Sequence, residues 1–424
     1  MLDRPTNRAD ALLILRGLAC LVIVIAHCQP PLTVLSSLPW GWLVAMPGGI
    51  AVRAFFTLSG YLIGKGFYLG RYGTSRSQLR RYIRNRAARI LPLYWAAVLI
   101  PAIFLAPSIL YPTAANDWVL LRYLTFTYNH TLPEQFNSPL WSLSTEVQFY
   151  AIAPLLFGMV RDRLRTVRLV LVAIGMVAIG GWAIREGIVW GLVQIHGGQT
   201  GEFNLDFVRY VYTFLPANLD AFLCGLLLNP LLLALLKSSQ SISSQPDRHN
   251  EFSISFVRHQ GQLLALSQTW FNHFLKYLKK YLKACAIVAI VSLFIQCTIW
   301  KMAGNGDLLS LGPSLSIAAV CLFIVAFEFG DAYHGFLNNQ PFSVMACWKN
   351  PWRCWEILGV LSYGIYVWHY PIAIWLLPKF GDFADLQAFA QRTIAVLTIA
   401  TIAAIVSHLA IERPGAAWLQ KLGR

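Results

Sequence analysis

The chain has 424 residues, of which 57% are hydrophobic and 12% are charged, and its formal net charge is +15. Its mean hydropathy of +0.54 excludes an ordinary soluble domain and fits a protein that crosses a membrane many times. The basic excess requires no nucleic-acid partner, because Lys and Arg accumulate in the cytoplasmic loops of such proteins.

Ten apolar stretches are long enough to cross a bilayer as helices. We therefore predict an all-α polytopic membrane protein in which residues 1–424 form a single transmembrane domain. The predicted spans are 11–29, 43–64, 90–110, 140–160, 168–190, 208–234, 284–303, 312–330, 356–378 and 391–411. The first span is not read as a cleaved signal sequence, because a bulky His27 precedes Cys28 and further spans follow. Residues 1–30 are expected in the mature protein.

The loop between the second and third spans is strongly basic and has no acidic residue. Its basic residues are Lys65, Arg71, Arg76, Arg80, Arg81, Arg84, Arg86 and Arg89. The alternate loops nearly lack Lys and Arg, so the positive-inside rule predicts that both termini are cytoplasmic. Arg161, Arg163, Arg165 and Arg168 follow the fourth span in the same way. The basic loop 237–283 is also predicted to be cytoplasmic, with a Ser-rich flexible linker and then a helix lying on the membrane surface.

Arg16 and His27 lie on the first span. Eleven residues of helix separate them by about 16 Å along the axis. Ionisable groups inside a membrane helix are costly and are functional candidates by default. The predicted orientation puts Arg16 near the cytoplasmic face and His27 near the outer face.

Polar residues in later spans can be placed by depth in the same way. Glu146 follows the start of the fourth span by about two turns, so we predict that it meets His27 in the outer half, where His369 of the ninth span also lies. Arg53 and Asp220 fall near the midplane and are predicted to neutralise each other or to line a polar cavity. Purely structural readings remain open: helix-dipole stabilisation for Glu146, interhelical hydrogen bonds for the histidines, and a structural pair for Arg53 and Asp220.

Two arginines, Arg86 and Arg89, precede the third span directly. Anchoring to anionic lipid head groups is the simpler reading for any one basic residue. A guanidinium group at this position would also suit a phosphorylated ligand from the cytosol.

Several segments of the chain together resemble acyltransferase family 3, which includes bacterial membrane O-acetyltransferases of surface polysaccharides and peptidoglycan. Seven segments follow the family's order, which makes the resemblance specific. They are Arg16-x10-His27 and the segments 55–62, 86–92, 141–150, 220–225, 362–371 and 412–414. The chain departs from the family pattern at Arg53, where an acidic or small residue is usual, and at Asn218, where a basic residue is common.

The resemblance implies transfer of an acyl group, best taken as acetyl, from cytoplasmic acyl-CoA to a hydroxyl of a carbohydrate acceptor at the outer face. His27 would be the base or the acyl-carrying nucleophile, and Glu146 would orient its ring. Arg16, Arg86 and Arg89 would bind the donor's phosphates, and no metal is expected. Further substrate-binding or structural polar residues would be Arg53, Ser59, Trp141, Ser142, Asp220, Tyr366 and His369.

The expected setting is the cytoplasmic (inner) membrane of a bacterium, with lipid and a carbohydrate or glycoside acceptor as partners, no nucleic acid, and a homodimer left open. Exopolysaccharide, lipopolysaccharide sugars, peptidoglycan and small glycosides are all compatible acceptors. Because only ten residues follow the 412–414 segment, we expect the protein to act alone or with a separate partner.

Two other function classes share the same gross features. Ten spans with buried charges also describe a transporter or a flippase of a glycan intermediate. Such proteins often contain an internal repeat, and residues 1–212 and 213–424 share no matching motifs. A membrane scaffold is the third reading, but only the 237–283 loop is long enough to offer a docking surface.

Overall fold

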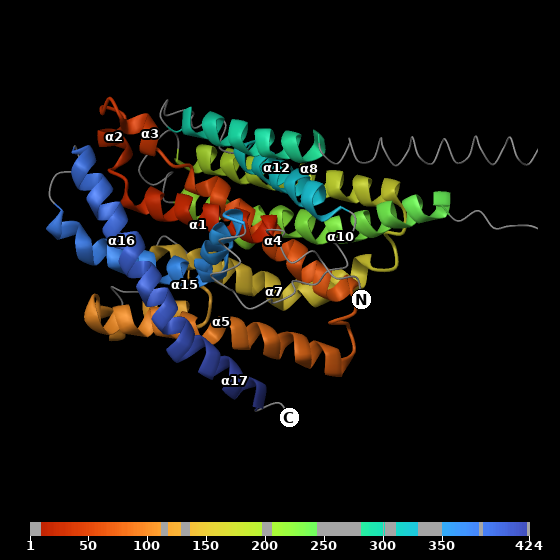
Figure 1. The fold of residues 1–424 in the computed structure, drawn as a ribbon, viewed down its shortest axis with the longest axis horizontal. Coiled ribbons are helices and arrows are strands. Elements are labelled where there is room, and N and C mark those ends of the chain that lie inside the picture. Colours follow the sequence, from red (N-terminus) through yellow and green to blue (C-terminus); the bar gives the residue numbers. More distant parts are fainter. Residues whose placement is uncertain are drawn as a thin grey trace, which may run out of the picture.

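The computed structural model describes residues 10–111, 118–128, 136–196, 206–243, 281–299, 301, 311–329, 350–380 and 385–421. Within these residues every regular element is helical. All ten predicted spans are confirmed as helices long and apolar enough to cross a membrane. Because ten is an even number, the start of the first span and the end of the last lie at the same end of the bundle, away from α2 and α3 (Figure 1).

The long helices follow one another along the chain and are connected by short ones. The long helices are α1 (Ala11–Cys28), α4 (Gly48–Tyr68), α5 (Arg76–Phe104), α7 (Trp141–Val160), α8 (Val167–His196), α10 (Leu215–Ser243), a helix over Tyr281–Ile299, α12 (Leu311–Glu328), α15 (Trp352–Leu376) and α16 (Leu386–Ser407). The short ones are α2 (Leu32–Leu35), α3 (Gly41–Val44), η1 (Pro107–Leu110), α6 (Val119–Leu124), η2 (Ser138–Leu140), η3 (Val208–Tyr212), η5 (Leu377–Lys379), η6 (His408–Glu412) and α17 (Arg413–Lys421).

Helix α1 carries both ends of the Arg16-x10-His27 segment, as predicted. It begins at Asp10, whose carboxylate accepts hydrogen bonds from the backbone N–H groups of Leu12 and Leu13. Such an N-cap satisfies donors that would otherwise be exposed at the helix start. The helix then runs without a break to Cys28, so Arg16 lies near its beginning and His27 in its last turn.

Two close helix pairs form the centre of the bundle, and glycine makes both possible. A Cβ on Gly60 of α4 would overlap the carbonyl oxygen of Phe222 on α10, and one on Gly225 would overlap that of Thr57. At the second pair, a Cβ on Gly359 of α15 would overlap the carbonyl oxygen of Leu13 on α1. Small residues let membrane helices approach closely enough for dense packing. The close approach of α1 to α15 positions the site described below.

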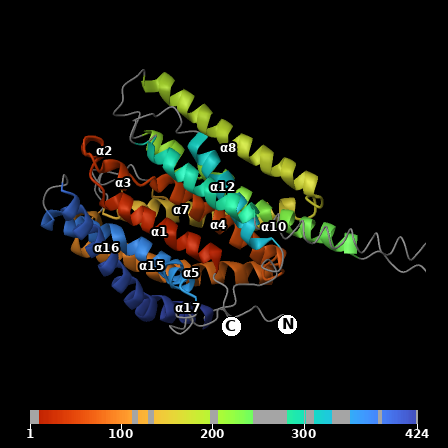
Figure 2. The same cartoon turned by 45° about the horizontal axis from the view of Figure 1, so that its top comes forward.

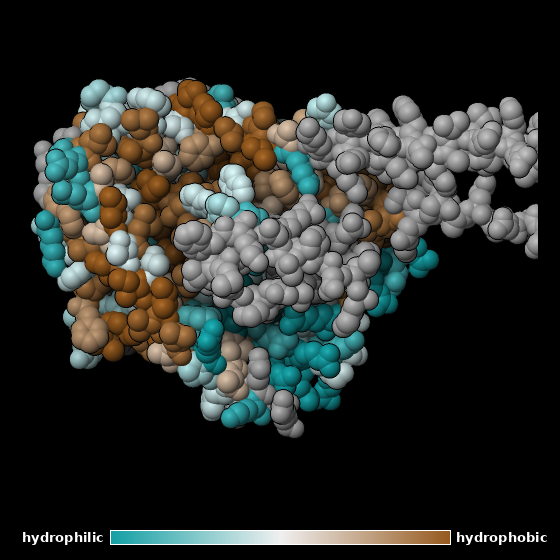
Figure 3. Space-filling view, viewed as in Figure 1, coloured by the Kyte–Doolittle hydropathy of each residue, from teal (hydrophilic) through white to brown (hydrophobic). Residues whose placement is uncertain are grey.

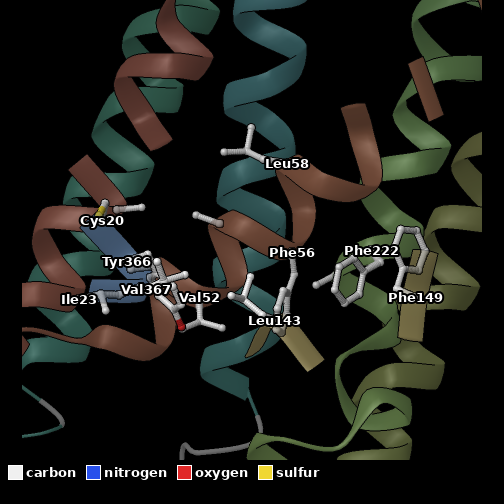
Figure 4. Close-up of a cluster of buried hydrophobic side chains, with 14 of the residues drawn as sticks. Cys20, Ile23, Val52, Phe56, Leu58, Leu143, Phe149, Phe222, Tyr366 and Val367 are labelled. Atoms are coloured by element: carbon white, nitrogen blue, oxygen red, sulfur yellow. The ribbon is translucent and has the colours of Figure 1, made fainter. Parts of the chain in front are cut away.

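Aromatic side chains fill the space between the helix pairs. Phe222 of α10 stacks on Phe56 of α4 at 4.5 Å between ring centroids and on Phe149 of α7 at 4.3 Å. Figure 4 shows this cluster together with Cys20 and Ile23 of α1 and with Tyr366 and Val367 of α15. Side chains from five helices thus share one core.

Helix α8 lies at the edge of the bundle, where it packs on α10 and α12 (Figure 2). Its outer surface is apolar: Met176, Ile179 and Trp190 are each more than 60% exposed. In a chain with ten spans, such surfaces are expected to face lipid. Figure 3 shows apolar side chains gathered over the left half and the top of one face, with polar ones toward the lower right, where α17 and the first turns of α5 lie.

The first residues of the predicted Ser-rich flexible linker are helical in the structure. Helix α10 continues through Ser243, because extending an existing helix costs little once it has formed. Residues 244–280, which include the rest of the linker and most of the predicted surface helix, lie outside the described residues. The next spanning helix begins at Tyr281.

Candidate active site

His27 and His369 form a hydrogen-bonded pair at one end of the bundle. His27 Nδ1 lies 3.0 Å from His369 Nε2, and the ring centroids are 5.1 Å apart. His369 is completely buried, and its Nδ1 lies 2.6 Å from the carbonyl oxygen of Tyr366. His27 is exposed. The two histidines, which were predicted only to lie in the same half of the bundle, are therefore direct neighbours, and one of them faces outward from the bundle.

Glu146 has different neighbours from those predicted. Its Oε1 accepts hydrogen bonds from the hydroxyls of Ser59 on α4 and Tyr150 on α7, whereas His27 pairs with His369. The reason is the depth at which α7 starts. It follows η2, and both Asn137 before η2 and Leu140 at its end are fully buried. Two turns further along, Glu146 lines a cavity with Arg16 instead, so the predicted His27–Glu146 contact is a wrong prediction.

The three predicted donor-binding arginines do gather. Arg89 of α5 interacts electrostatically with Arg16, Arg86 and Glu146. Arg16 lies 5.9 Å from the ring centre of Phe55, and its buried Nε has no hydrogen-bond partner among the described residues. Three guanidinium groups near one carboxylate leave a local excess of positive charge that suits an anionic ligand.

Tyr72, in the loop between α4 and α5, contacts this cluster. Its hydroxyl lies 3.3 Å from Arg86 Nη2 and 3.4 Å from the side-chain nitrogen of Asn85. Burial raises the pKa of Tyr72, but the positive charge and hydrogen bond of Arg86 outweigh burial, and the pKa lies below its ordinary value of 10. The loop thus adds a polar contact that holds Arg86 in place.

A small cavity of about 40 Å³ lies beside Glu146. Arg16 lines it from α1, Glu146 from α7 and Tyr366 from α15. The Tyr366 hydroxyl donates to the carbonyl oxygen of Pro139 at 2.9 Å and lies 2.6 Å from Ser142 Oγ, which also lines the cavity. Three predicted polar residues, Ser142, Tyr366 and His369, therefore lie in one connected network.

A larger groove of about 890 Å³ runs between α5 and α7. Its walls are mainly apolar, with Arg86 and Tyr150 along its length. Tyr150 also donates to Glu146, which lines the small cavity. The groove and the cavity are therefore separated by the Tyr150–Glu146 hydrogen bond.

Arg53 and Asp220 do not form a direct ion pair, although the charge of Asp220 acts on Arg53. Asp220 accepts from Arg185 Nη1 at 2.8 Å, and both side chains are buried. Arg53 lies over the ring of Tyr212 at 5.4 Å, and its Nε and Nη1 have no hydrogen-bond partner among the described residues. Arg185, and not Arg53, forms the ion pair with Asp220, because α8 packs directly against α10. The charge of Arg185 within the fifth apolar stretch was the sequence signal for this pair.

The other predicted polar residue, Trp141, has a packing role in the structure. It contacts Tyr212 at 5.0 Å and Phe56 at 6.1 Å between ring centroids. Its ring therefore connects the start of α7 with α4 and η3.

Two further polar arrangements were missed in the sequence. Lys65 Nζ and the Tyr61 hydroxyl each lie 2.6 Å from Glu328 Oε2, in a buried cluster that joins α4 to α12. Asn137 donates from its side-chain nitrogen to the carbonyl oxygens of Ala97 and Val367, at 3.1 Å each. The Lys65–Glu328 cluster could have been predicted from the charges near the ends of two apolar stretches. The Asn137 contacts could not, because an uncharged Asn in a loop gives no comparable indication.

In the described part of the chain, no group of three or more His, Cys, Asp or Glu side chains is arranged to hold a metal ion. Within the described residues, a substrate could bind at the arginine cluster and in the two cavities beside it.

A family model for the acyltransferase domain of acyltransferase family 3 matches residues 10–413. The chain belongs to this family. The match covers both α1 and α15, so it includes the paired histidines and all three clustered arginines. No solved structure matches the chain.

Individual relatives are more distant. The chain is 33% identical over 121 residues to the acyltransferase MdmB of Streptomyces mycarofaciens, a match that covers 27% of this chain and 30% of that protein. It is 30% identical over 154 residues to the peptidoglycan O-acetyltransferase OatA of Listeria monocytogenes, covering 33% of this chain and 22% of OatA. The YrhL protein of Bacillus subtilis is 23% identical over 94% of this chain and 54% of its own length. The chain thus spans about half or less of these relatives.

Proposed function

We propose that this protein is a membrane O-acyltransferase that moves an acyl group, best taken as acetyl, from acyl-CoA in the cytoplasm to a hydroxyl of a carbohydrate acceptor on the other face of the membrane. Family membership and the name of the relative OatA support the reaction class and the acceptor class. The basic residues at and after the α4–α5 turn, most of them in the first half of α5, support an orientation in which the arginine cluster faces the cytoplasm of a bacterial cell and His27 faces outward.

The observation that carries the proposal is the arrangement of Arg16, Arg89 and His27. Arg16 lies in the arginine cluster with Arg89, and His27 lies about 16 Å further along the same helix. Coenzyme A has a charged nucleotide end and a long, mostly uncharged arm that ends in the thioester. Its phosphates would bind the arginines while the arm reaches toward the histidines.

The two cavities support a route for that arm. The apolar groove contains Arg86 and leads to Tyr150. Beyond the Tyr150–Glu146 hydrogen bond lies the cavity that ends at Tyr366, one turn before His369. A donor entering by this route would have to displace the Tyr150–Glu146 contact. Glu146 would then offset part of the arginines' charge next to the thioester, instead of orienting His27.

The chemistry needs a base, because a sugar hydroxyl is a weak nucleophile until it loses its proton. His27 would take that proton as the hydroxyl oxygen attacks the thioester carbonyl, the C–S bond would break, and the imidazolium would return the proton to the departing thiolate. Alternatively, His27 would attack the thioester itself, release coenzyme A and pass the acyl group from its ring nitrogen to the acceptor. Both routes require that one ring nitrogen of His27 be unprotonated.

The test is acyl transfer by His27→Ala in membranes where the variant is inserted and as abundant as wild type. With radiolabelled acetyl-CoA and the host's surface glycans as acceptor, we expect a loss of at least about 100-fold in transfer, the usual contribution of a general base. His196→Ala is the matched control, since His196 lies at the end of the peripheral helix α8 and pairs with Asp206 at 3.0 Å. Near-normal transfer by His27→Ala would overturn the assignment.

The acceptor is identified by comparing surface glycans from cells with and without the gene. Mass analysis is expected to show that sugars of one polymer lose about 42 Da for each missing acetyl ester, because an acetyl group replaces one hydroxyl hydrogen. Accumulation of an unmodified glycan precursor inside the cell, with ester content unchanged on what is exported, would instead support the transporter or flippase reading.

A further inference from the structure

We propose that His369 is a positioning residue that holds His27 in a single tautomer, the one in which Nδ1 carries the hydrogen and Nε2 carries the lone pair. The inference rests on the proposed function, because it explains how His27 is prepared for proton or acyl transfer. It assigns to a second, neutral histidine the orienting task that Glu146 was expected to perform.

The assignment starts from the backbone contact of His369. Its Nδ1 lies 2.6 Å from the carbonyl oxygen of Tyr366. A carbonyl oxygen can only accept, so Nδ1 of His369 must carry the hydrogen and donate. The carbonyl of Ile365 is a second acceptor close to the same ring. This contact therefore determines which nitrogen of His369 is protonated.

The neutral form of His369 follows from its surroundings. Its side chain is completely buried, and in the described part of the chain no carboxylate is hydrogen-bonded to it. A buried imidazolium without such a partner is costly. With its hydrogen on Nδ1, the neutral ring presents a lone pair on Nε2. That lone pair points at His27, 3.0 Å away.

The tautomer of His27 is then determined by its neighbour. His369 Nε2 can only accept, so His27 Nδ1 must donate. In a neutral His27 ring the other nitrogen, Nε2, consequently carries the lone pair that a base or a nucleophile needs. The hydrogen-bond chain runs from His27 through His369 to the Tyr366 carbonyl, and its direction is set by the last group.

The pair is also held mechanically. Tyr366, which supplies the carbonyl, is anchored through its hydroxyl to Pro139 and Ser142. The edge of the Tyr370 ring packs on His27 at 5.3 Å and 82°. The close approach of α1 to α15 at Gly17, where an added Cβ would lie 2.8 Å from the backbone nitrogen of Gly359, limits sliding of one helix along the other.

This arrangement favours the transition state over the ground state. When His27 Nε2 takes the acceptor's proton, its ring becomes positive and Nδ1 still donates to His369. The hydrogen bond is then charge-assisted and stronger than between two neutral rings. An interaction that strengthens during the reaction lowers the barrier. His369 would therefore affect turnover more than donor binding.

The experiment compares His369→Leu with His369→Gln in the full-length protein reconstituted in lipid nanodiscs with acetyl-CoA and the glycan acceptor. Leu fills the site but accepts no hydrogen bond, whereas the side-chain oxygen of Gln can accept from His27 Nδ1. We expect Leu to lower kcat by roughly 10- to 100-fold, the effect of losing a hydrogen bond to a charged group in the transition state, with the KM for acetyl-CoA within about twofold of wild type. Gln is expected to recover most of kcat.

Three outcomes separate the alternatives. A His369→Leu variant with kcat within about twofold of wild type would overturn the positioning role. So would a Gln variant as slow as Leu, provided that both are as thermostable as wild type, because then the hydrogen-bond acceptor is not what matters. His27→Ala is measured in parallel. If it remains active, the proposed catalytic role of His27 fails; if it is inactive while His369→Leu is active, only the positioning role fails.

Discussion

Arg185 and Asp220 connect α8 to α10 through an ion pair in which Nη1 lies 2.8 Å from Oδ2. The same guanidinium donates to the carbonyl oxygen of Ala217 at 2.8 Å and to Ser314 of α12 at 2.7 Å. Since α8 exposes most of its remaining surface, this buried cluster is its main polar link to the rest of the bundle. Its contribution should therefore be measurable as stability of the whole protein.

Arg185→Leu is expected to destabilise the protein, because it leaves the Asp220 carboxylate buried without its cation. Breaking such a pair from one side costs about 3–5 kcal/mol. The measurement is the free energy of unfolding in detergent micelles. The double variant Arg185→Met with Asp220→Leu should recover much of that loss, since neither charge then remains. Equal loss in the single and double variants would show that packing, not charge pairing, holds α8.

Gly60→Ala is expected to force α4 and α10 apart, because the new methyl group would overlap the carbonyl oxygen of Phe222. Overpacking of this kind costs about 1–3 kcal/mol or more when backbone must move. Thermal unfolding of the purified protein checks it. Gly187→Ala on α8 is the control, since a Cβ there meets nothing within 4 Å; the idea fails if both substitutions lower the unfolding temperature equally.

Arg86→Ala should weaken binding of acetyl-CoA by roughly 10- to 100-fold, the effect of losing a hydrogen bond to a charged group. The spans should remain inserted, because Arg86 is not part of a helix–helix ion pair among the described residues. Direct binding of labelled acetyl-CoA in nanodiscs at two salt concentrations is the measurement. Arg161→Ala removes an exposed arginine that pairs with Asp162 and should leave affinity unchanged. If Arg86→Ala binds acetyl-CoA as tightly as Arg161→Ala does, Arg86 does not bind the donor, and anchoring to lipid head groups is the better explanation.

Lys65→Met is expected to be much more damaging than Tyr61→Phe. Both donors contact Glu328 Oε2 at 2.6 Å, but only Lys65 neutralises the carboxylate, whose side chain is 11% exposed. We expect a loss of about 3–5 kcal/mol for Lys65→Met and about 1.5–3 kcal/mol for Tyr61→Phe in unfolding free energy. Adding Glu328→Gln should rescue the Lys65 variant, and no rescue would contradict an electrostatic role.

Some parts of the site followed from the sequence because they depend on a single helix. The spacing of Arg16 and His27 needs only that residues 11–28 be helical, and the number of spans needs only hydrophobic stretches of sufficient length. Arg86 and Arg89 likewise lie close together because they are three residues apart on one helix, which puts them on the same face. Each of these features is local, so amino-acid order and helix geometry are enough to predict it.

The pairings between helices followed from the tertiary structure alone. The predicted depth in the membrane suggested Glu146 as the partner of His27. Because α7 starts inside the bundle, Glu146 instead contacts Ser59 and Tyr150. Arg53 and Asp220 were matched by depth, yet Arg185 approaches Asp220 from another helix. Depth is one coordinate, whereas a hydrogen bond also requires the rotation of each helix and its neighbours. Those are decided by side-chain packing, such as the contact of Gly17 with Gly359 that brings α1 against α15 and His27 against His369.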